Sequence, residues 1–406
     1  MTAASVAQDT RSVQVADVFK AGRRAAQLRR TGSGTEFAYL PEFASDGVAI
    51  ATTLPISTDP LRYPPGAVPA FFAGMLPEGR RLTALRRLVK TSADDELSLL
   101  LAVGRDVIGD VQLVPEGEMP TEAEALITVQ SSFSEVRFSE ILGGADVVDR
   151  SGIPGVQDKA SARMISVPVA QAAGRYILKV DPPEFQHVVE NEHYFLDTAR
   201  SAGIPTTQAD LVTDADGRKG LLVRRFDRVV DHAGTVHSRA CEDACQLLNL
   251  WPADKYNVSS EELAAAVGRV CAAGPVAVRD VYRQLCFAWL TGNGDVHAKN
   301  ISVLATPEGE WRVAPAYDLP STLPYNDLTL ALPVQGRSDG LSRRLMLDFA
   351  GTIGMTPKAA TSTLDDMLDA TAHVPSDLRD GAVPFSQQTL STWTKRLDYR
   401  RKLLKA

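Results

Sequence analysis

Residues 294–300 read Gly-Asp-Val-His-Ala-Lys-Asn, and this stretch decides how the rest of the chain is understood. Asn300 follows Asp295 by five residues, so a short loop can aim both side chains at one phosphate group. A carboxylate in such a loop orients or accepts the proton of an attacking hydroxyl, and an asparagine carbonyl oxygen binds Mg²⁺. Taken alone, the stretch is more simply explained as a polar turn at Asn293-Gly294 that Asp295 caps.

A second acidic group follows at Asp318, after the strand-like residues Trp311-Arg312-Val313. Protein kinases place their second magnesium ligand at such a strand end, about twenty residues after the catalytic loop. Magnesium is a hard cation that needs oxygen ligands close to the phosphates. A surface aspartate before a turn is the simpler explanation of this residue when it is considered alone.

A lysine that can bind phosphate lies at Lys179, inside the apolar run 175–180, which is predicted to be a buried strand. A lysine is costly to bury unless it is paired. The helix predicted over 188–202 carries Glu190 and Glu192, and a strand lysine paired with a helix glutamate grips ATP phosphates in kinases. The alternative is a lysine that reaches solvent from an edge strand.

A turn and a hairpin complete the set. Residues 151–159 form a glycine-containing turn in which backbone N–H groups can approach phosphates, although both common phosphate-loop signatures are missing. Residues 206–212 and 220–226 are predicted to pair as a hairpin, whose second strand leads into a hinge that binds adenine through its backbone. The chain order is then phosphate loop, strand lysine, helix glutamate, hinge, catalytic loop and metal aspartate. This is the order of protein kinases. It favours an ATP-dependent phosphotransferase over the explanation that six unrelated structural features occur in this order by chance.

Composition is consistent with such an enzyme. The chain has 406 residues, with 43 Lys and Arg against 50 Asp and Glu, so its net charge is 43 − 50 = −7. This length predicts two or three structural units, and a hydrophobic content of 44% excludes a mainly disordered chain. No apolar run reaches about 18 residues and no signal peptide is evident, so we expect no membrane contact. Four cysteines without metal-site spacing favour a reducing cytoplasm, and the acidic balance argues against nucleic-acid binding over the whole surface.

We predict an α+β fold, with an N-terminal mixed α/β subdomain over 1–145 and a kinase-like core over 146–406. Within the core, 146–235 would form a small β-rich lobe that binds nucleotide, and 236–406 a mostly α-helical C-terminal lobe. An acidic linker with Pro and Gly at 115–125 predicts a boundary within 115–148. Helical periodicity and capping residues predict helices over 80–90, 92–104, 188–202, 242–250, 259–272, 276–291, 340–354, 357–370 and 387–404.

Together these segments resemble the HipA-type serine/threonine kinases, which are the toxin halves of bacterial toxin–antitoxin pairs. The resemblance covers nearly the whole chain. Its most specific part is the run D-x-H-A-K-N-x-S at 295–302, which is followed by P-x-Y-D at 315–318. The other matching segments are 68–72, 76–80, 101–106, 108–109, 155–159, 191–192, 225–228 and 242–246.

The resemblance implies a role for each matching residue. Asp295 would act as the general base, and Asn300 and Asp318 would bind Mg²⁺. Lys179 would bind the phosphates of ATP. The other nucleotide-binding residues implied by the resemblance are Pro154, Gly155, Val156, Gln157, Asp158 and Lys159 in the phosphate loop, Arg224, Arg225 and Phe226 in the hinge, and His297, Lys299 and Tyr317.

The resemblance also implies partners and a modification. Family members phosphorylate a serine on a protein, glutamyl-tRNA synthetase in the best known case. They are held inactive by a small helix-turn-helix antitoxin, HipB-like, that binds operator DNA, so contact with DNA would run mainly through this partner. Gly152 occupies the usual position of the family's autophosphorylated serine, which leaves Ser151 as the nearest candidate. Arg224 stands where the family commonly has an acid.

Two alternatives stay open. The form D-x-H-x-x-N also resembles lipid kinases, so a lipid or small-molecule kinase is one alternative, and the match of the N-terminal unit to the toxin family argues against it. A co-repressor that acts mainly by binding a DNA-binding antitoxin is the other. The complete set of catalytic groups argues that catalysis is retained.

Overall fold

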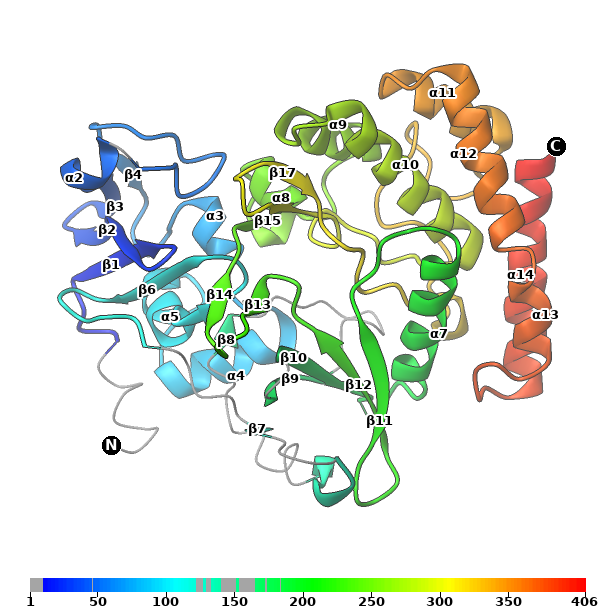
Figure 1. Ribbon diagram of the computed structural model, residues 1–406, viewed down its shortest axis with the longest axis horizontal. Helices are drawn as coiled ribbons and strands as arrows, with labels where there is room; N and C mark the ends of the chain where they lie inside the picture. The colour runs from blue at the N-terminus through cyan, green and yellow to red at the C-terminus, as the bar shows by residue number, and fades with distance from the viewer. Residues whose placement is uncertain are drawn as a thin grey trace.

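The computed structural model describes residues 10–45, 47–121, 127–128, 133–139, 151–152, 165–171, 174–182 and 184–406. The fold is α+β, as the sequence predicts, with an N-terminal unit on one side and a helix-rich part on the other (Figure 1). A second sheet and a small hairpin lie between them. Within the described ranges, no helix is both long enough and apolar enough to cross a membrane.

The N-terminal unit is a five-stranded antiparallel sheet with short helices packed on it, in the strand order β4-β3-β2-β1-β6. Its core includes Phe37 from the sheet and Phe72 and Leu100 from the helices. The helix predicted over 92–104 begins at Glu96, because the Asp95 side chain accepts a hydrogen bond from the backbone N–H of Ser98 and caps the helix there. The elements are β1 (Val15–Lys20), β2 (Arg23–Thr31), β3 (Gly34–Tyr39), α2 (Pro41–Ala44), β4 (Leu61–Tyr63), α3 (Ala70–Ala73), α4 (Gly79–Val89), α5 (Glu96–Val103) and β6 (Val111–Pro115).

The small lobe is built on a second five-stranded sheet, in the order β11-β12-β10-β9-β7, with one long helix beside β11 and β12. A two-residue parallel pairing joins Asp106-Val107 of the N-terminal unit to Ser151-Gly152. The elements are β5 (Asp106–Val107), β7 (Ile127–Thr128), the 3₁₀ turn η1 (Phe133–Glu135), β8 (Ser151–Gly152), β9 (Ile165–Gln171), β10 (Gly174–Val180), α7 (Val188–Ser201), β11 (Ala209–Thr213), β12 (Lys219–Arg224), β13 (Arg228–Val230) and β14 (Val236–Ser238).

The C-terminal lobe is mostly helical, and one predicted helix there is wrong in its first part. Residues 242–243 of the helix predicted over 242–250 belong instead to a strand over 241–243 that pairs with 302–304, and Asp243 then caps a single helical turn. The elements are β15 (Cys241–Asp243), α8 (Ala244–Leu247), η3 (Pro252–Asp254), α9 (Ser260–Val270), α10 (Gly274–Thr291), β16 (Ser302–Ala305), β17 (Trp311–Val313), η4 (Leu323–Tyr325), α11 (Arg343–Thr352), α12 (Pro357–Ala370), α13 (Val374–Arg379) and α14 (Gln387–Lys405).

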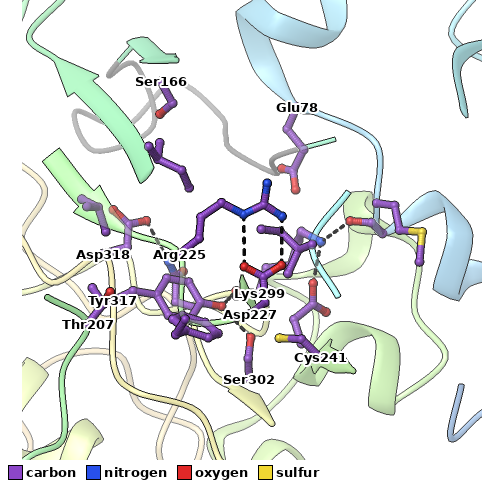
Figure 2. A pocket seen from close by; sticks show the side chains of 18 of the residues that line it. Glu78, Ser166, Thr207, Arg225, Asp227, Cys241, Lys299, Ser302, Tyr317 and Asp318 are labelled. Atoms are coloured by element: carbon purple, nitrogen blue, oxygen red, sulfur yellow. Dashed lines mark hydrogen bonds and ion pairs between the residues drawn. The ribbon is translucent and has the colours of Figure 1, made fainter. Parts of the chain in front are cut away.

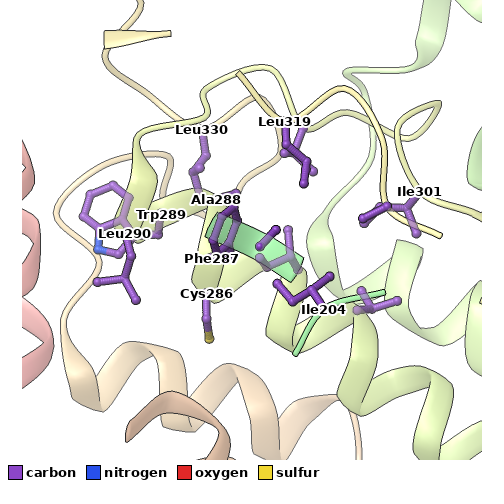
Figure 3. Close-up of a cluster of buried hydrophobic side chains, with 14 of the residues drawn as sticks. Ile204, Cys286, Phe287, Ala288, Trp289, Leu290, Ile301, Leu319 and Leu330 are labelled. Atoms are coloured by element: carbon purple, nitrogen blue, oxygen red, sulfur yellow. The ribbon is translucent and has the colours of Figure 1, made fainter. Parts of the chain in front are cut away.

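Helix α10 forms the rigid base of the stretch at 294–300. Its last six residues, 286–291, are all buried, so neighbours surround this end on every side (Figure 3). The helix ends at Gly292, whose φ of +76° is the left-handed conformation that favours glycine. A Cβ at this position would lie 2.3 Å from Leu323 Cδ1, so no larger residue fits without movement. The segment 293–300 therefore starts at a fixed point at the end of α10.

Candidate active site

The strand lysine and a helix glutamate meet in the structure. Lys179 Nζ donates to Oε1 and Oε2 of Glu192 at 2.7 and 2.8 Å. The sequence leaves Glu190 and Glu192 open as partners, and the fold selects Glu192 because it shares the buried face of α7 with Val188 and Leu196. The Glu192 side chain is only 1% exposed, so its carboxylate is bound by the Lys179 ammonium instead of by water.

The two residues expected to bind magnesium also touch each other. Asp318 Oδ1 accepts from Lys179 Nζ at 3.2 Å, and Asp318 Oδ2 accepts from Asn300 Nδ2 at 2.8 Å. Asp318 has a φ of +57°, which is uncommon outside glycine and is found where the surrounding structure forces one orientation. Glu192, Lys179, Asp318 and Asn300 therefore form one connected set of contacts.

This set carries more negative than positive charge. Burial lowers the pKa of Lys179, but the carboxylates of Asp318 and Glu192 outweigh burial and raise the pKa of Lys179 above its usual value. Burial raises the pKa of Glu192, the ammonium of Lys179 lowers it, and the charge of nearby Asp318 raises it further. One ammonium thus faces two carboxylates, an imbalance that a bound cation would relieve.

The catalytic stretch is a hydrogen-bonded loop. The backbone N–H of Asp295 donates to Asn293 Oδ1 at 2.9 Å, and the backbone N–H of His297 donates to Asn300 Oδ1 at 3.2 Å. Tyr256, from another part of the lobe, donates its hydroxyl to Asp295 Oδ1 at 3.1 Å. Asp295 is 3% exposed, so its carboxylate is held by protein contacts rather than by solvent.

A hollow of about 1050 Å³, open to solvent, lies between the small lobe, the C-terminal lobe and the N-terminal unit (Figure 2). Nine predicted site residues line it: Lys179, Arg224, Arg225, Phe226, His297, Lys299, Asn300, Tyr317 and Asp318. Asp295 is not among the described residues that line it, although it belongs to the same loop as His297 and Asn300. Residues 154–159 lie outside the described residues, and Ser151 lies in β8.

The two hinge arginines do different things. The guanidinium of Arg225 faces Asp227 (Figure 2), to which it donates at 2.9 Å. It also donates to Asp106 Oδ1 at 2.7 Å. Arg228 joins the same two carboxylates, so four buried or nearly buried charges connect the hinge to β5. Arg224 is at the surface and donates to Gln208 Oε1 at 2.9 Å. The Arg225 side chain is therefore part of the structural framework behind the hollow.

The ammonium of Lys299 is also held by the protein. Its Nζ donates to Asp243 Oδ2 at 2.6 Å and to the backbone O of Gly74 at 2.9 Å. The Tyr317 hydroxyl donates to the backbone O of Lys299 at 2.6 Å, and it lies 2.6 Å from Ser302 Oγ. Lys299 thus ties the catalytic loop to β15 and to the N-terminal unit.

Sequence reasoning missed the residues that the N-terminal unit contributes. Gly74, Met75, Glu78 and Ile108 form part of the wall of the hollow, and Glu78 forms an ion pair with Lys255 of the C-terminal lobe. No spacing rule connects positions so far apart in the chain. The signal was that the segments 76–80 and 108–109 resembled the family while having no chemical role in the prediction.

Comparison with known proteins agrees with this architecture. A family model described as the HipA N-terminal domain matches residues 16–114, and one described as the HipA-like C-terminal domain matches residues 151–374. Y4mE of Sinorhizobium fredii is 29% identical over 405 residues, covering 91% of this chain and 94% of that protein. The serine/threonine-protein kinase toxin HipA of Shewanella oneidensis is 27% identical over 331 residues, covering 74% of this chain and 73% of that protein.

A solved structure shares the fold. It is the HipA chain of the complex of Shewanella oneidensis MR-1 HipA, HipB and their operator DNA, with a TM-score of 0.77 and 19% identity. The superposition covers 96% of this chain and 97% of that one, so both parts of the fold are shared. With its N-terminal and C-terminal parts both matched by the family's own domains, the chain belongs to the HipA family.

Proposed function

We propose that this chain is an ATP- and Mg²⁺-dependent protein serine/threonine kinase and the toxin of a toxin–antitoxin module. One observation carries the proposal: Lys179, Glu192, Asp318 and Asn300 are in contact, and three of them line one large hollow. A lysine paired with a helix glutamate, beside an aspartate and an asparagine, is how kinases hold ATP phosphates and their metal. The kinase named among the relatives supports the same activity.

The lining of the hollow combines the apolar and polar groups that a nucleotide needs. Ligand pockets typically have mostly apolar walls with a few polar groups that fix orientation, and this hollow has both kinds of side chain. Apolar side chains line one part, with the rings of Phe226 and Tyr317 centred 5.7 Å apart. An adenine would lie against these residues beside the hinge, and the phosphates would lie toward Lys179.

The donor set fits magnesium. Mg²⁺ in phosphotransferases is held by one or two carboxylates and by the phosphates, rather than by a cage of protein ligands. In keeping with this, the described part of the chain contains no cluster of three or more His, Cys, Asp or Glu that could hold a metal by itself. Asp318 and Asn300 would supply the protein oxygens, and the bound metal would neutralise charge on the phosphate oxygens.

The chain's own residues would then position the reactants. Lys179, fixed by Glu192 and only 14% exposed, would neutralise phosphate charge from a preset position. Asp295 would accept the proton of the serine or threonine hydroxyl, and its orientation is set by Asn293 and Tyr256. Most of the rate enhancement would come from holding hydroxyl and phosphate in line.

The biological setting is also part of the proposal. The related HipA chain was solved with HipB and operator DNA, which supports a HipB-like helix-turn-helix antitoxin as partner and indirect contact with DNA. The substrate would be a protein of the translation machinery, such as glutamyl-tRNA synthetase, in the cytoplasm. Ser151 would be the site of autophosphorylation. The division of roles would follow an N-terminal subdomain over 1–145 and a catalytic core over 146–406.

The test is incubation of the purified chain with ATP, Mg²⁺ and a bacterial lysate, followed by phosphopeptide identification. We expect new phosphoserine or phosphothreonine sites that the Asp295→Asn variant does not produce. Equal phosphorylation by Asp295→Asn would refute the assignment of the base. Mass spectrometry of the chain itself after the same incubation tests Ser151, and an unmodified Ser151 would remove that part of the proposal.

A further inference from the structure

A buried ion pair is one of the contacts that join the N-terminal unit to the C-terminal lobe. Glu78 stands just before α4, and its Oε2 accepts from the ammonium of Lys255. The Lys255 side chain is 1% exposed and that of Glu78 is 12% exposed, so both charges depend on each other. Glu78 is therefore more than a wall residue, because its removal would leave a buried lysine without its partner.

Lys255 belongs to residues 252–257, which we call the strap, and the strap is bonded to the catalytic loop. The backbone N–H of Ala298 donates to the backbone O of Lys255 at 3.2 Å. The next residue, Tyr256, donates its hydroxyl to Asp295 Oδ1 at 3.1 Å. The Tyr256 ring also packs edge-on against His297, with centroids 5.1 Å apart. Two adjacent strap residues thus contact three residues of the loop.

These contacts form a continuous path from the N-terminal unit to the catalytic carboxylate. Helix α10 fixes the start of the loop at Gly292, while the strap supports Asp295, His297 and Ala298 from the side. A hydrogen bond to a carboxylate is stronger than one between neutral groups and strongly favours one orientation of the acid. A shift of the strap would therefore turn the carboxylate away from its productive orientation.

We propose that Tyr256 and Glu78 are positioning residues for phosphoryl transfer. Glu78 fixes the position of Lys255 and therefore of the strap. Tyr256, the next strap residue, then fixes the orientation of the Asp295 carboxylate through its hydrogen bond. This inference rests on the proposed kinase function and on Asp295 as its base. If the inference holds, the N-terminal unit helps to position the catalytic base. A partner that moves α4 away from the strap would then lower turnover without covering the hollow.

The test compares the full-length wild type with Glu78→Gln, Tyr256→Phe and the double variant. Transfer of labelled γ-phosphate to lysate protein is measured over a range of ATP concentrations, and ATP binding is measured by calorimetry. We expect each single variant to lower kcat about tenfold or more, because a hydrogen bond to a charged group is lost, while KM for ATP changes by less than about twofold. The double variant should be no slower than the slower single variant, because both act through the strap.

Thr52→Val is the matched control. It removes another contact between the two parts, the bond from the Thr52 hydroxyl to Glu242 Oε2 at 2.7 Å, and keeps the bond from the Thr52 backbone N–H to Glu242 Oε1 at 2.9 Å. It should leave kcat unchanged. Unchanged kcat in Tyr256→Phe, additive losses in the double variant, or a raised KM with normal kcat in Glu78→Gln would each overturn the inference. A folded wild type without any ATP-dependent transfer would instead overturn the proposed function, and the inference with it. Thermal unfolding of each variant shows whether it is folded, and Tyr256→Phe removes only one hydroxyl.

Discussion

Replacing Asp227 by Asn tests how the two parts of the molecule are joined. The Asp227 carboxylate is 2% exposed and accepts from Arg225, from Arg228 and from the backbone N–H of Gly109, at 2.6–3.1 Å. An asparagine keeps the shape but removes the charge, which leaves two buried guanidinium groups with Asp106 as their remaining carboxylate. Breaking a buried ion pair in this way costs about 3–5 kcal/mol.

The pKa of Asp227 supports a loss of this order. Burial raises this pKa, but Arg225 and Arg228 outweigh burial and lower it from 3.8 to about 2, which corresponds to roughly 2 kcal/mol. Because the folded-state pKa is depressed, this stability is present above about pH 4 and is lost as the pH falls toward 2.

The assay is thermal unfolding at pH 7, with Asp231→Asn as the control. Asp231 is 40% exposed and pairs with His237 at the surface, so the same substitution should have little effect on stability. We expect the melting temperature of Asp227→Asn to fall by about 4–6 °C, and that of Asp231→Asn to change by less than about 1.5 °C. Equal, small changes in both variants would refute the reasoning that this buried charge cluster fastens the N-terminal unit to the hinge.

Three further predictions follow from single sites. Burial raises the pKa of Glu242 to about 7, so the wild type should lose stability relative to Glu242→Gln as the pH rises from about 4.5 to 8. Chemical unfolding should show a loss of up to about 3 kcal/mol, and a constant difference between the two proteins across that range would contradict this prediction. Gly292→Ala should destabilise the fold by more than about 2 kcal/mol, because a Cβ would meet Leu323. Gly309 has a similar left-handed backbone but open space around it, so Gly309→Ala should cost about 1 kcal/mol, and equal losses in the two variants would contradict the steric argument. Lys179→Met should weaken ATP binding at least tenfold in calorimetry, whereas replacing the exposed Lys219 by Met should leave ATP binding unchanged. If Lys179→Met bound ATP as tightly as the wild type, the phosphates would lie elsewhere.

The fold and the centre of the site could be predicted because their signals are local or ordered. Strand and helix periodicity located β10, α7 and α10, and the chain order of a strand lysine, a helix acid and a polar loop predicted that Lys179, Asn300 and Asp318 would come together. The structure adds which acid pairs with the lysine, because only the buried face of α7 distinguishes Glu192 from Glu190.

Other features could not be predicted, because they join distant positions with no fixed spacing. The partners of Arg225 include Asp106, which is 119 residues away, and those of Lys299 include the backbone of Gly74, which is 225 residues away. The strand at 241–243 was mistaken for helix because its pairing with 302–304 is a tertiary contact. In each case the missing information is which surfaces face one another.

The central claim is that Asp318, held between Lys179 and Asn300, serves metal-dependent transfer of phosphate from ATP. The most direct measurement is the initial rate at which labelled γ-phosphate moves from ATP to protein, for the wild type and Asp318→Asn, with Mg²⁺ and with the metal chelated. We expect transfer only in the wild type with Mg²⁺, and a loss of at least a hundredfold in Asp318→Asn with the fold intact. Transfer that survives chelation, or that is equal in the folded Asp318→Asn variant, would contradict the account.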